Sequence, residues 1–374
     1  MHKIMSSSNP DAKKIAYFIS PHGFGHAARA CAVIQAVQAV WPDLHFHLFT
    51  TVPEWFFQNS LASNWSYHSA ICDIGLVQKS ALHEDVDATL VELKRFLPFS
   101  EITVRQLANE LRVLACQFVI CDIAPLGLSV AAEADLPSVL IENFTWDWIY
   151  SGYPERMDEF QPWVEYLAGV FKLATYHIKT HPYCGDGVAD LITLPVSRKP
   201  RLNRALIRDT LHITPTQKTV LVSLGGIPDR LAVAGLEAFN SDTVFIVPGG
   251  SESEQWRGNL LLLPHRHPYF HPDLVAGCDA VVGKVGYSTI SEIYWAGMPF
   301  AYISRPAFRE SLPLVEYIRQ NISGLELTPV EFESYGWLQR IDQLLGLPTV
   351  NRNGENGADQ IVNFLAGVGL FKFY

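Results

Sequence analysis

The chain has 374 residues, of which 48% are hydrophobic and 18% are charged, and its formal net charge is −10. This composition can bury a large core, and the length predicts about two domains in a soluble globular protein. The acidic balance and the lack of any broad basic run argue against a nucleic-acid partner, because neutralising phosphates requires clustered Lys and Arg.

Targeting and redox signals favour a cytoplasmic protein. Residues 1–14 are polar and lack the apolar core of a signal peptide, and no apolar stretch reaches the roughly 18 residues of a membrane span. The six cysteines form no CxxC pair and are expected to be reduced thiols. A basic segment at 198–208 is either a solvated linker or a contact for an anionic or membrane-associated acceptor, so peripheral association stays open.

Short apolar runs alternate with helix-length segments along most of the chain. The runs predict strands at 15–20, 45–50, 118–121, 138–141 and 177–180, and then at 219–223, 243–247, 280–282 and 300–303. Helices are predicted between them at 27–40, 88–115, 229–239, 289–296 and 314–321. This alternation is typical of βαβ units in parallel sheets that are buried on both faces.

A proline-punctuated polar segment at 193–201, TLPVSRKPR, interrupts the alternation. It predicts an N-terminal domain at 1–195 and a C-terminal domain at 196–374, with a final helix able to pack back on the first domain. Two doubly wound, Rossmann-like α/β domains that face each other leave a cleft at the carboxyl ends of their strands, where ligands bind such sheets.

A glycine loop, HGFGHAAR, follows the first predicted strand. Gly23, Gly25 and Ala28 satisfy the dinucleotide pattern G-x-G-x-x-G/A. That pattern also requires an acidic residue about 20 positions on, and the second strand ends in LFTTV instead, which disfavours NAD or FAD. The glycines still allow the backbone to approach a ligand, and the following helix presents free amides.

Two histidines, His22 and His26, flank this loop. A metal site would need both on one continuous helix, which the intervening glycines disfavour, so no metal site is predicted. A neutral histidine suits a general base, because its pKa lies near the working pH. For His22, a turn histidine bonded to the backbone is an equal alternative.

A second set of glycine loops lies in the C-terminal half. Gly225 and Gly226 follow one strand, and Gly286 precedes the helix predicted from Thr289. Two glycine loops that converge on one cleft suit a diphosphate. Thr289-Ile-Ser-Glu292 also fits a capping box, so Glu292 is either a ligand-binding residue or a cap of its own helix.

Several of these motifs resemble a known group of enzymes. HGFGHAAR, CDIAPLGLSVAAEADLPSVLIENFTWDWIY and GKVGYSTISE resemble the glycosyltransferase-like amino-terminal domain of plant L-arabinokinases. STISEIYWAGMPF is similar to a donor-binding segment of the peptidoglycan N-acetylglucosaminyltransferase. The resemblance spans roughly 15–321 and implies the GT-B fold. No glycine-rich kinase loop follows, so sugar kinase activity is not expected.

The resemblance also implies roles for individual residues. It implies that His26 deprotonates the acceptor hydroxyl and that Asp122 orients His26, with a helix cap before Pro125 as the alternative role of Asp122. It implies donor binding by Gly225, Gly226, Gly286, Ser288 and Thr289 at the diphosphate, by Glu292 at the ribose, and by Arg309 and Glu310 at the sugar. No metal or cofactor is implied.

Acceptor-binding candidates lie beside the first loop and after the strand at 138–141. They are His22, Gly23, Gly25, Trp146, Asp147 and Trp148. Aromatic faces suit a sugar or lipid acceptor, although aromatics this close together more often pack against each other. Asp85-Val-Asp87 matches a metal-binding pattern, but acidic residues favouring a helix amino end explain it better.

The implied activity is inverting transfer of a sugar from a nucleoside diphosphate sugar, with a UDP-sugar as the expected donor. The acceptor would be a hydroxyl group of a small molecule, a saccharide or a lipid-linked compound. Two alternatives stay open. One is a non-hydrolysing nucleotide-sugar epimerase, and the other is a catalytically silent nucleotide-sugar-binding module.

Overall fold

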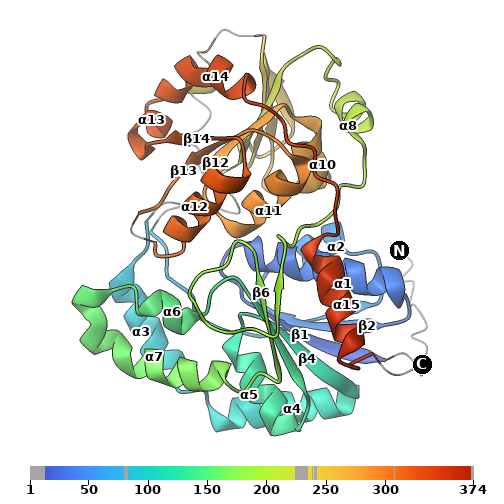
Figure 1. The fold of residues 1–374 in the computed structure, drawn as a ribbon, viewed down its shortest axis with the longest axis vertical. Coiled ribbons are helices and arrows are strands. Elements are labelled where there is room, and N and C mark those ends of the chain that lie inside the picture. Colours follow the sequence, from blue (N-terminus) through green and yellow to red (C-terminus); the bar gives the residue numbers. More distant parts are fainter. Residues whose placement is uncertain are drawn as a thin grey trace.

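The structure is a computed structural model that describes residues 13–79, 83–223, 235–237, 239, 242–306 and 308–371. The described residues form two seven-stranded sheets, one in each half of the chain. Figure 1 shows the two halves stacked along the long axis, with helices α1 (Gly25–Val40) and α11 (Tyr287–Ala296) lying between the sheets.

The first sheet is parallel throughout and has the strand order β3-β2-β1-β4-β5-β6-β7. Its strands are β1 (Lys14–Ile19), β2 (His45–Thr50), β3 (Trp65–Ser69), β4 (Cys116–Asp122), β5 (Ser138–Glu142), β6 (Tyr176–Thr180) and β7 (Leu191–Thr193). Besides α1, the helices of this half are α2 (Glu54–Ser60), α3 (Val86–Phe96), α4 (Glu101–Leu114), α5 (Pro125–Ala134), α6 (Trp146–Tyr150), η1 (Pro154–Arg156) and α7 (Met157–Phe171).

The second sheet has the order β10-β11-β9-β8-β12-β13-β14 and is parallel except at its β10–β11 edge. Its strands are β8 (Thr219–Ser223), β9 (Val244–Pro248), β10 (Gln255–Arg257), β11 (Leu260–Leu263), β12 (Ala280–Lys284), β13 (Phe300–Ile303) and β14 (Gly324–Leu327). Besides α11, its helices are α8 (Arg204–Thr210), α10 (His271–Gly277), α12 (Ser311–Asn321), α13 (Pro329–Glu333), η2 (Gly336–Arg340), α14 (Ile341–Leu345) and α15 (Gly357–Gly367).

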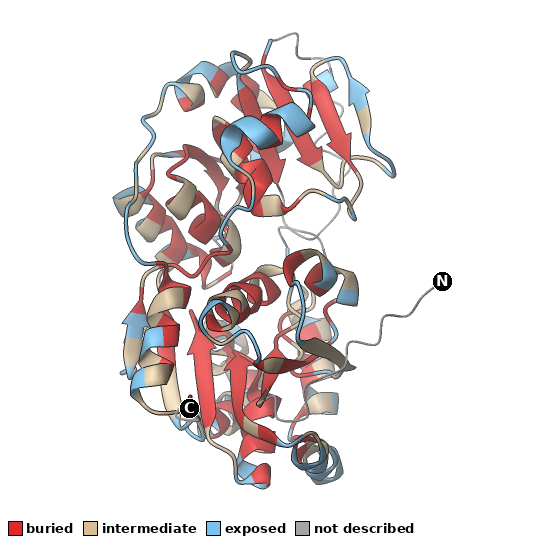
Figure 2. Ribbon diagram, turned by 90° about the vertical axis from the view of Figure 1, so that its right-hand side faces the viewer, coloured by how far each residue is buried: buried red, intermediate tan, exposed pale blue. Residues whose placement is uncertain are grey.

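Strand β1 shows why both faces of the first sheet are covered. Successive side chains of a strand point to opposite faces. Ile15 and Tyr17 belong to the apolar cluster under α1, whereas Ala16 and Phe18 belong to the cluster under α5 and α7. Figure 2 shows the central strands of both sheets as mainly buried, whereas edge strands such as β3 and β10 are intermediate or exposed. The continuous apolar runs in the sequence are the consequence of this two-sided burial.

Helix α15 returns from the second half to the first. Its Ala358, Ile361 and Leu365 are buried in the same cluster as Ala30 and Val33 of α1. Figure 1 shows α15 beside α1, against the sheet of the opposite half. The end of the described chain therefore completes the core of the first half.

All nine predicted strands are present, but several predicted helices differ from the structure, and those predicted from 27 and 314 begin at Gly25 and Ser311. The helix predicted at 88–115 is two helices, α3 and α4, because Pro98 interrupts it and disfavours helical backbone at Leu97. The helix predicted from Thr289 begins at Tyr287. The helix predicted at 229–239 lies largely outside the described residues.

Two further sequence features have a structural counterpart. The six cysteines are buried and form no disulfide. Within the described chain, no helix combines the length and the apolar character that crossing a membrane requires.

Candidate functional site

A cavity of about 400 Å³ lies between the two halves, at the carboxyl ends of β1 and β12. The first half lines it with residues 21–26 and with Ile74, Leu76, Gln78 and Phe144. The second half lines it with Lys284, residues 286–289, Arg305, Phe308 and Glu310. Parallel α/β sheets bind their ligands at this edge.

His26 lies in the first turn of α1 and is held by Asp122, the last residue of β4. Strands β1 and β4 pair with Ile19 opposite Asp122, which brings the carboxylate to the loop that precedes α1. His26 Nδ1 lies 2.9 Å from Asp122 Oδ1. A carboxylate only accepts hydrogen bonds, and this contact is shorter than the 3.3 Å between Nδ1 and Arg29 Nη2, so it favours the proton on Nδ1 and, in the neutral ring, leaves Nε2 able to accept.

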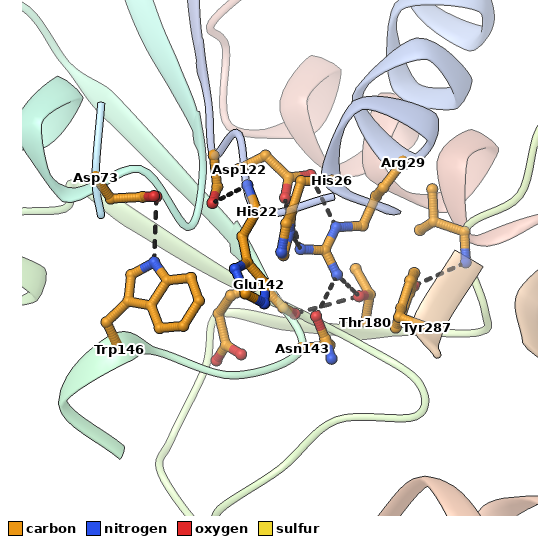
Figure 3. A network of polar contacts seen from close by, with 12 residues as sticks. His22, His26, Arg29, Asp73, Asp122, Glu142, Asn143, Trp146, Thr180 and Tyr287 are labelled. Carbon is orange, nitrogen blue, oxygen red and sulfur yellow. Dashed lines mark hydrogen bonds and ion pairs between the residues drawn. The ribbon is translucent and has the colours of Figure 1, made fainter. Parts of the chain in front are cut away.

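Arg29, one turn after His26, holds the same carboxylate. Its Nε donates to Asp122 Oδ2 at 2.8 Å and its Nη2 donates to Oδ1 at 2.7 Å. Figure 3 shows the guanidinium between Asp122 on one side and Asn143 and Thr180 on the other. It also lies 4.5 Å from the ring centre of Tyr287, the first residue of α11. Arg29 therefore connects the first half with the helix of the second.

The Arg29 guanidinium decides the charge of Asp122, which is 0% exposed. Burial alone would raise the pKa of Asp122, but the charge and hydrogen bonds of Arg29 outweigh burial and hold this pKa below its usual range. The carboxylate is therefore ionised at neutral pH. The alternative role of Asp122 as a helix cap is wrong, because Ala124 is the N-cap residue of α5 and the Asp122 oxygens contact His26 and Arg29 instead.

His22 also lines the cavity, and its ring is neutral. Its Nε2 lies 3.3 Å from Gln78 Nε2, and its ring packs edge-on against Trp146. Burial, together with the nearby His26, lowers the pKa of His22 to about 3. The following residue, Gly23, has a φ of +71°, a backbone conformation that glycine adopts without strain.

The N-terminus of α11 faces the first glycine loop across the cavity. Gly286 is its N-cap residue and makes no side-chain cap, so the first amides of the helix are not satisfied by the cap. Ser288 and Thr289 line the cavity beside it. A Cβ atom placed on Gly25 would lie only 3.7 Å from Ser288 Oγ. Gly225 and Gly226 lie outside the described residues.

Glu292 is an ion-pairing residue. Its carboxylate lies 2.8 Å from Arg198 Nη2 and 2.6 Å from His271 Nδ1. Burial alone would raise the pKa of Glu292, but Arg198 and His271 together lower it to about 2. The capping-box alternative is wrong, because α11 begins before Thr289. Glu292 instead lines a second cavity of about 120 Å³, together with Trp55, Phe56, Arg198, His265, Tyr269 and His271.

The two residues expected at the donor sugar occupy different places. Glu310 lines the main cavity and accepts a hydrogen bond of 2.8 Å from Asn143 Nδ2. Arg309 does not line it. Its guanidinium lies 4.0 Å from the Trp148 ring centre and donates to Ser151 Oγ at 2.6 Å and to the Trp148 carbonyl. Arg309 therefore joins the loop after β13 to α6.

The aromatic acceptor candidates mainly pack against other residues. Trp146 is 1% exposed and stacks on Tyr150. Its Nε1 donates to Asp73 Oδ2 at 3.1 Å, a contact that Figure 3 shows. Neither Trp146, Asp147 nor Trp148 lines the main cavity, whereas His22, Gly23 and Gly25 do.

The Asp85-Val-Asp87 pattern has a structural role. Asp85 accepts from the Ala88 amide at 3.0 Å as the N-cap of α3, and Asp87 pairs with Arg156 at 2.8 Å. Both carboxylates therefore have partners that explain their position at the start of this helix.

The sequence interpretation missed Lys284 and Arg305. Lys284 ends β12 and pairs with Ile303 of β13, so Arg305, two residues further on, lies on the adjacent strand end. Both line the main cavity. Burial and the neighbouring Arg305 lower the pKa of Lys284 to about 8. Lys284 stands between the two glycines of GKVG, a position that could have identified it as a residue of the candidate site.

We expect Arg29→Met to lower the free energy of unfolding by about 3–5 kcal/mol, because it leaves the buried Asp122 carboxylate uncompensated. Urea-induced unfolding measures this change. Arg105→Met, which removes an exposed arginine paired with Glu101, should stay close to the parent protein. The double variant Arg29→Met/Asp122→Asn should recover part of the loss. Equal stability of the Arg29 and Arg105 variants would contradict the assigned role.

Comparisons with known proteins agree with this architecture. No family model matches the chain. It is 27% identical to an L-arabinokinase of Arabidopsis thaliana over 361 residues, which cover 94% of this chain and 34% of the relative. The chain thus spans about a third of the length of that relative. This match confirms the resemblance that the sequence motifs indicated.

Three solved structures share the fold at low identity. MurG of Acinetobacter baumannii is 11% identical with a TM-score of 0.55, covering 95% of this chain and 99% of its own. The spinosyn forosaminyltransferase SpnP is 14% identical with a TM-score of 0.59, covering 95% and 99%. A UDP-glucosyltransferase from Polygonum tinctorium is 13% identical with a TM-score of 0.59, covering 97% and 99%. The chain therefore has the GT-B fold, as the motifs predicted.

Proposed function

We propose that this chain is an inverting glycosyltransferase that moves a sugar from a nucleoside diphosphate sugar to a hydroxyl group of an acceptor. One observation carries the proposal. His26, held by the Asp122 carboxylate, lines the same cavity as the open N-terminus of α11. A base and an anion-binding helix end on one cavity are what a displacement at a sugar carbon requires. The low-identity structural relatives include glycosyltransferases, which supports this choice.

The proposed reaction is a single displacement. Nε2 of His26 takes the proton of the acceptor hydroxyl while the hydroxyl oxygen bonds to the anomeric carbon. The bond between that carbon and the diphosphate breaks, and attack from the opposite side inverts the configuration. Asp122 keeps the proton of His26 on Nδ1 and stabilises the imidazolium that forms.

The donor would bind to the second half of the chain. We assign its diphosphate to Gly286, Ser288 and Thr289 at the start of α11, where free amides and the helix dipole favour anions, with Lys284 adding a positive charge. Gly225 and Gly226 remain proposed phosphate ligands on sequence grounds. Glu310 is proposed to contact the sugar, and Arg309 to position this loop against Trp148.

We also propose a ligand for the ribose of the donor and an identity for its base. Glu292 is proposed as the ribose ligand, and its site would then share the carboxylate with Arg198 and His271. The proposed base of the donor is uracil.

The acceptor would approach from the first half, past His22, Gly23 and Gly25, which line the cavity. Trp146, Asp147 and Trp148 are proposed to support that wall from behind. The acceptor can be a small molecule, a saccharide or a lipid-linked compound.

Each of the two sheets is proposed to form the centre of one substrate-binding domain. We propose residues 1–195 as the acceptor domain and 196–374 as the donor domain, with α15 structurally part of the former. The unbridged cysteines support a reducing, cytoplasmic location. Peripheral membrane association through a lipid-linked acceptor is compatible with this proposal.

An epimerase is less well supported. It would need additional acid and base carboxylates around the sugar, and among the described lining residues of the main cavity Glu310 is the only carboxylate. A silent binding module would retain donor affinity without turnover, so analysis of the product sugar separates the three activities.

We expect His26→Ala to reduce transfer by about 10²–10⁴-fold, because it removes the general base, while donor affinity stays nearly unchanged. Product formation with an acceptor found by mass-spectrometric screening gives the rate, and calorimetry gives donor affinity. His22→Ala keeps His26 and should lose much less activity. An inactive His22→Ala beside a fully active His26→Ala would exchange the two roles.

Gly286→Val should weaken UDP binding by at least about tenfold, a loss of about 1.4 kcal/mol, because the branched side chain would obstruct the amides of α11. A Cβ atom on Gly286 meets no protein atom within 4 Å, so the variant should fold. Gly169→Val in α7, where a Cβ also meets no atom, is the matched control. Parental UDP affinity in a folded Gly286→Val protein would reject the assigned phosphate site.

We also expect turnover to survive EDTA, because α11 and Lys284 would stabilise the leaving diphosphate in place of a divalent cation. Initial rates with and without the chelator test this expectation. A complete loss that Mg²⁺ or Mn²⁺ restores would refute it.

A further inference from the structure

Arg305 is a buried cation that lacks a polar partner for its side chain. Only 8% of its surface is exposed, and its Nε is buried without a hydrogen bond in the described part of the chain. The guanidinium lies 4.4 Å from the ring centre of Phe308, and no hydrogen bond or ion pair joins it to another described residue. Its backbone amide, in contrast, donates to Ser311 Oγ at 2.9 Å.

Without a bound anion, a buried guanidinium that has no polar partner is energetically unfavourable. A guanidinium carries five N–H donors and stays charged, and burying an unpaired charge is unfavourable. Burial indeed lowers the pKa of Arg305 from its usual value, although nearby acidic groups act against this shift. Because Arg305 lines the main cavity, an anion bound there can supply the missing partner.

Among the described residues, no hydrogen bond or ion pair joins the carboxylates near Arg305 to its guanidinium. Glu310 and Glu84 are close enough to influence its pKa. However, Glu310 accepts from Asn143 at 2.8 Å, and Glu84 accepts from the Tyr153 hydroxyl at 3.4 Å. Lys284 adds a second positive charge on the adjacent strand end. This wall of the cavity therefore holds two cations, Lys284 and Arg305, against one lining carboxylate, Glu310, and keeps an excess of positive charge.

The two cations occupy different positions relative to α11. Lys284 is separated from the helix N-cap, Gly286, by a single residue, so it is placed to serve the diphosphate. Arg305 lies one strand further out, in the loop that also carries Glu310. That loop belongs to the donor half. This position suits an anion that the donor carries beyond its diphosphate.

We propose that Arg305 binds a carboxylate on the sugar of the donor, so that the donor is a nucleoside diphosphate uronic acid. The planar guanidinium fork matches a carboxylate through two parallel hydrogen bonds, which a hydroxymethyl group at the same carbon cannot form. This inference rests on the proposed function, because it extends the donor site described there.

The test compares donors that differ only at C6 of the sugar. Calorimetry measures the affinities of UDP, UDP-glucose and UDP-glucuronate, and then of UDP-galactose and UDP-galacturonate, because the sugar configuration is open. In at least one pair the parent protein should bind the uronic acid about 10- to 100-fold more tightly, as a charge-assisted hydrogen bond pair allows.

Variants then assign the preference to Arg305. Arg305→Gln should abolish the preference for the uronic acid and leave UDP affinity unchanged, whereas Arg305→Lys should retain part of the preference. Lys284→Gln should weaken UDP and all UDP-sugars by a similar factor. Arg319→Gln, an exposed arginine of α12 paired with Glu326, is the matched control and should bind like the parent.

Three outcomes would overturn the inference. Equal affinity for the uronic acid and the neutral sugar in both pairs would show that Arg305 does not bind a carboxylate of the donor. A loss of UDP affinity in Arg305→Gln as large as in Lys284→Gln would make Arg305 a diphosphate ligand. If free glucuronate or galacturonate binds to the UDP-saturated protein while the UDP-linked uronic acids show no preference, the carboxylate at Arg305 belongs to the acceptor. A parent protein that binds no uridine nucleotide would instead contradict the proposed donor site itself.

Discussion

The buried ion pair between Asp122 and Arg29 is the interaction on which the site depends. Asp122 has no contact with solvent, so its charge persists only because Arg29 donates to both of its oxygens. The same carboxylate holds His26 in the tautomer that leaves Nε2 free. Without Arg29, the Asp122 carboxylate would be a buried charge without its cationic partner.

This ion pair also connects the two halves of the chain. Arg29 donates to Asn143, and Asn143 in turn donates to Glu310 of the loop after β13. The buried apolar clusters are largely separate, since the two under the second sheet contain residues of that half alone. From the second half, Phe308 enters one cluster of the first half, and Val196, helix α15 and Phe371 enter the other. Polar contacts therefore set much of the geometry of the cavity.

The sequence predicted the fold well because buried parallel strands are continuous apolar runs, as β1 and β8 illustrate. It predicted the proximity of His26 and Asp122 only through a family resemblance, since nothing in the spacing of two residues 96 positions apart reveals strand pairing. The local capping patterns at Asp122 and Glu292 were misleading, because long-range partners, Arg29 and Arg198, capture these carboxylates. Arg305 was missed because a sequence does not show which cation lacks a partner.

The distribution of charge around the cavity links donor binding to the chemistry of His26. On the first-half wall, Asp122 is neutralised by Arg29, and His22 is neutral because its pKa is about 3. Lys284 and Arg305 supply two positive charges against the one carboxylate of Glu310, and both cations act on His22, which stands four residues before His26. A proton that arrives on His26 adds a further positive charge to this region. The negative diphosphate of the proposed donor would offset that charge, and we infer that His26, as the proposed base, would work best once the donor is in place.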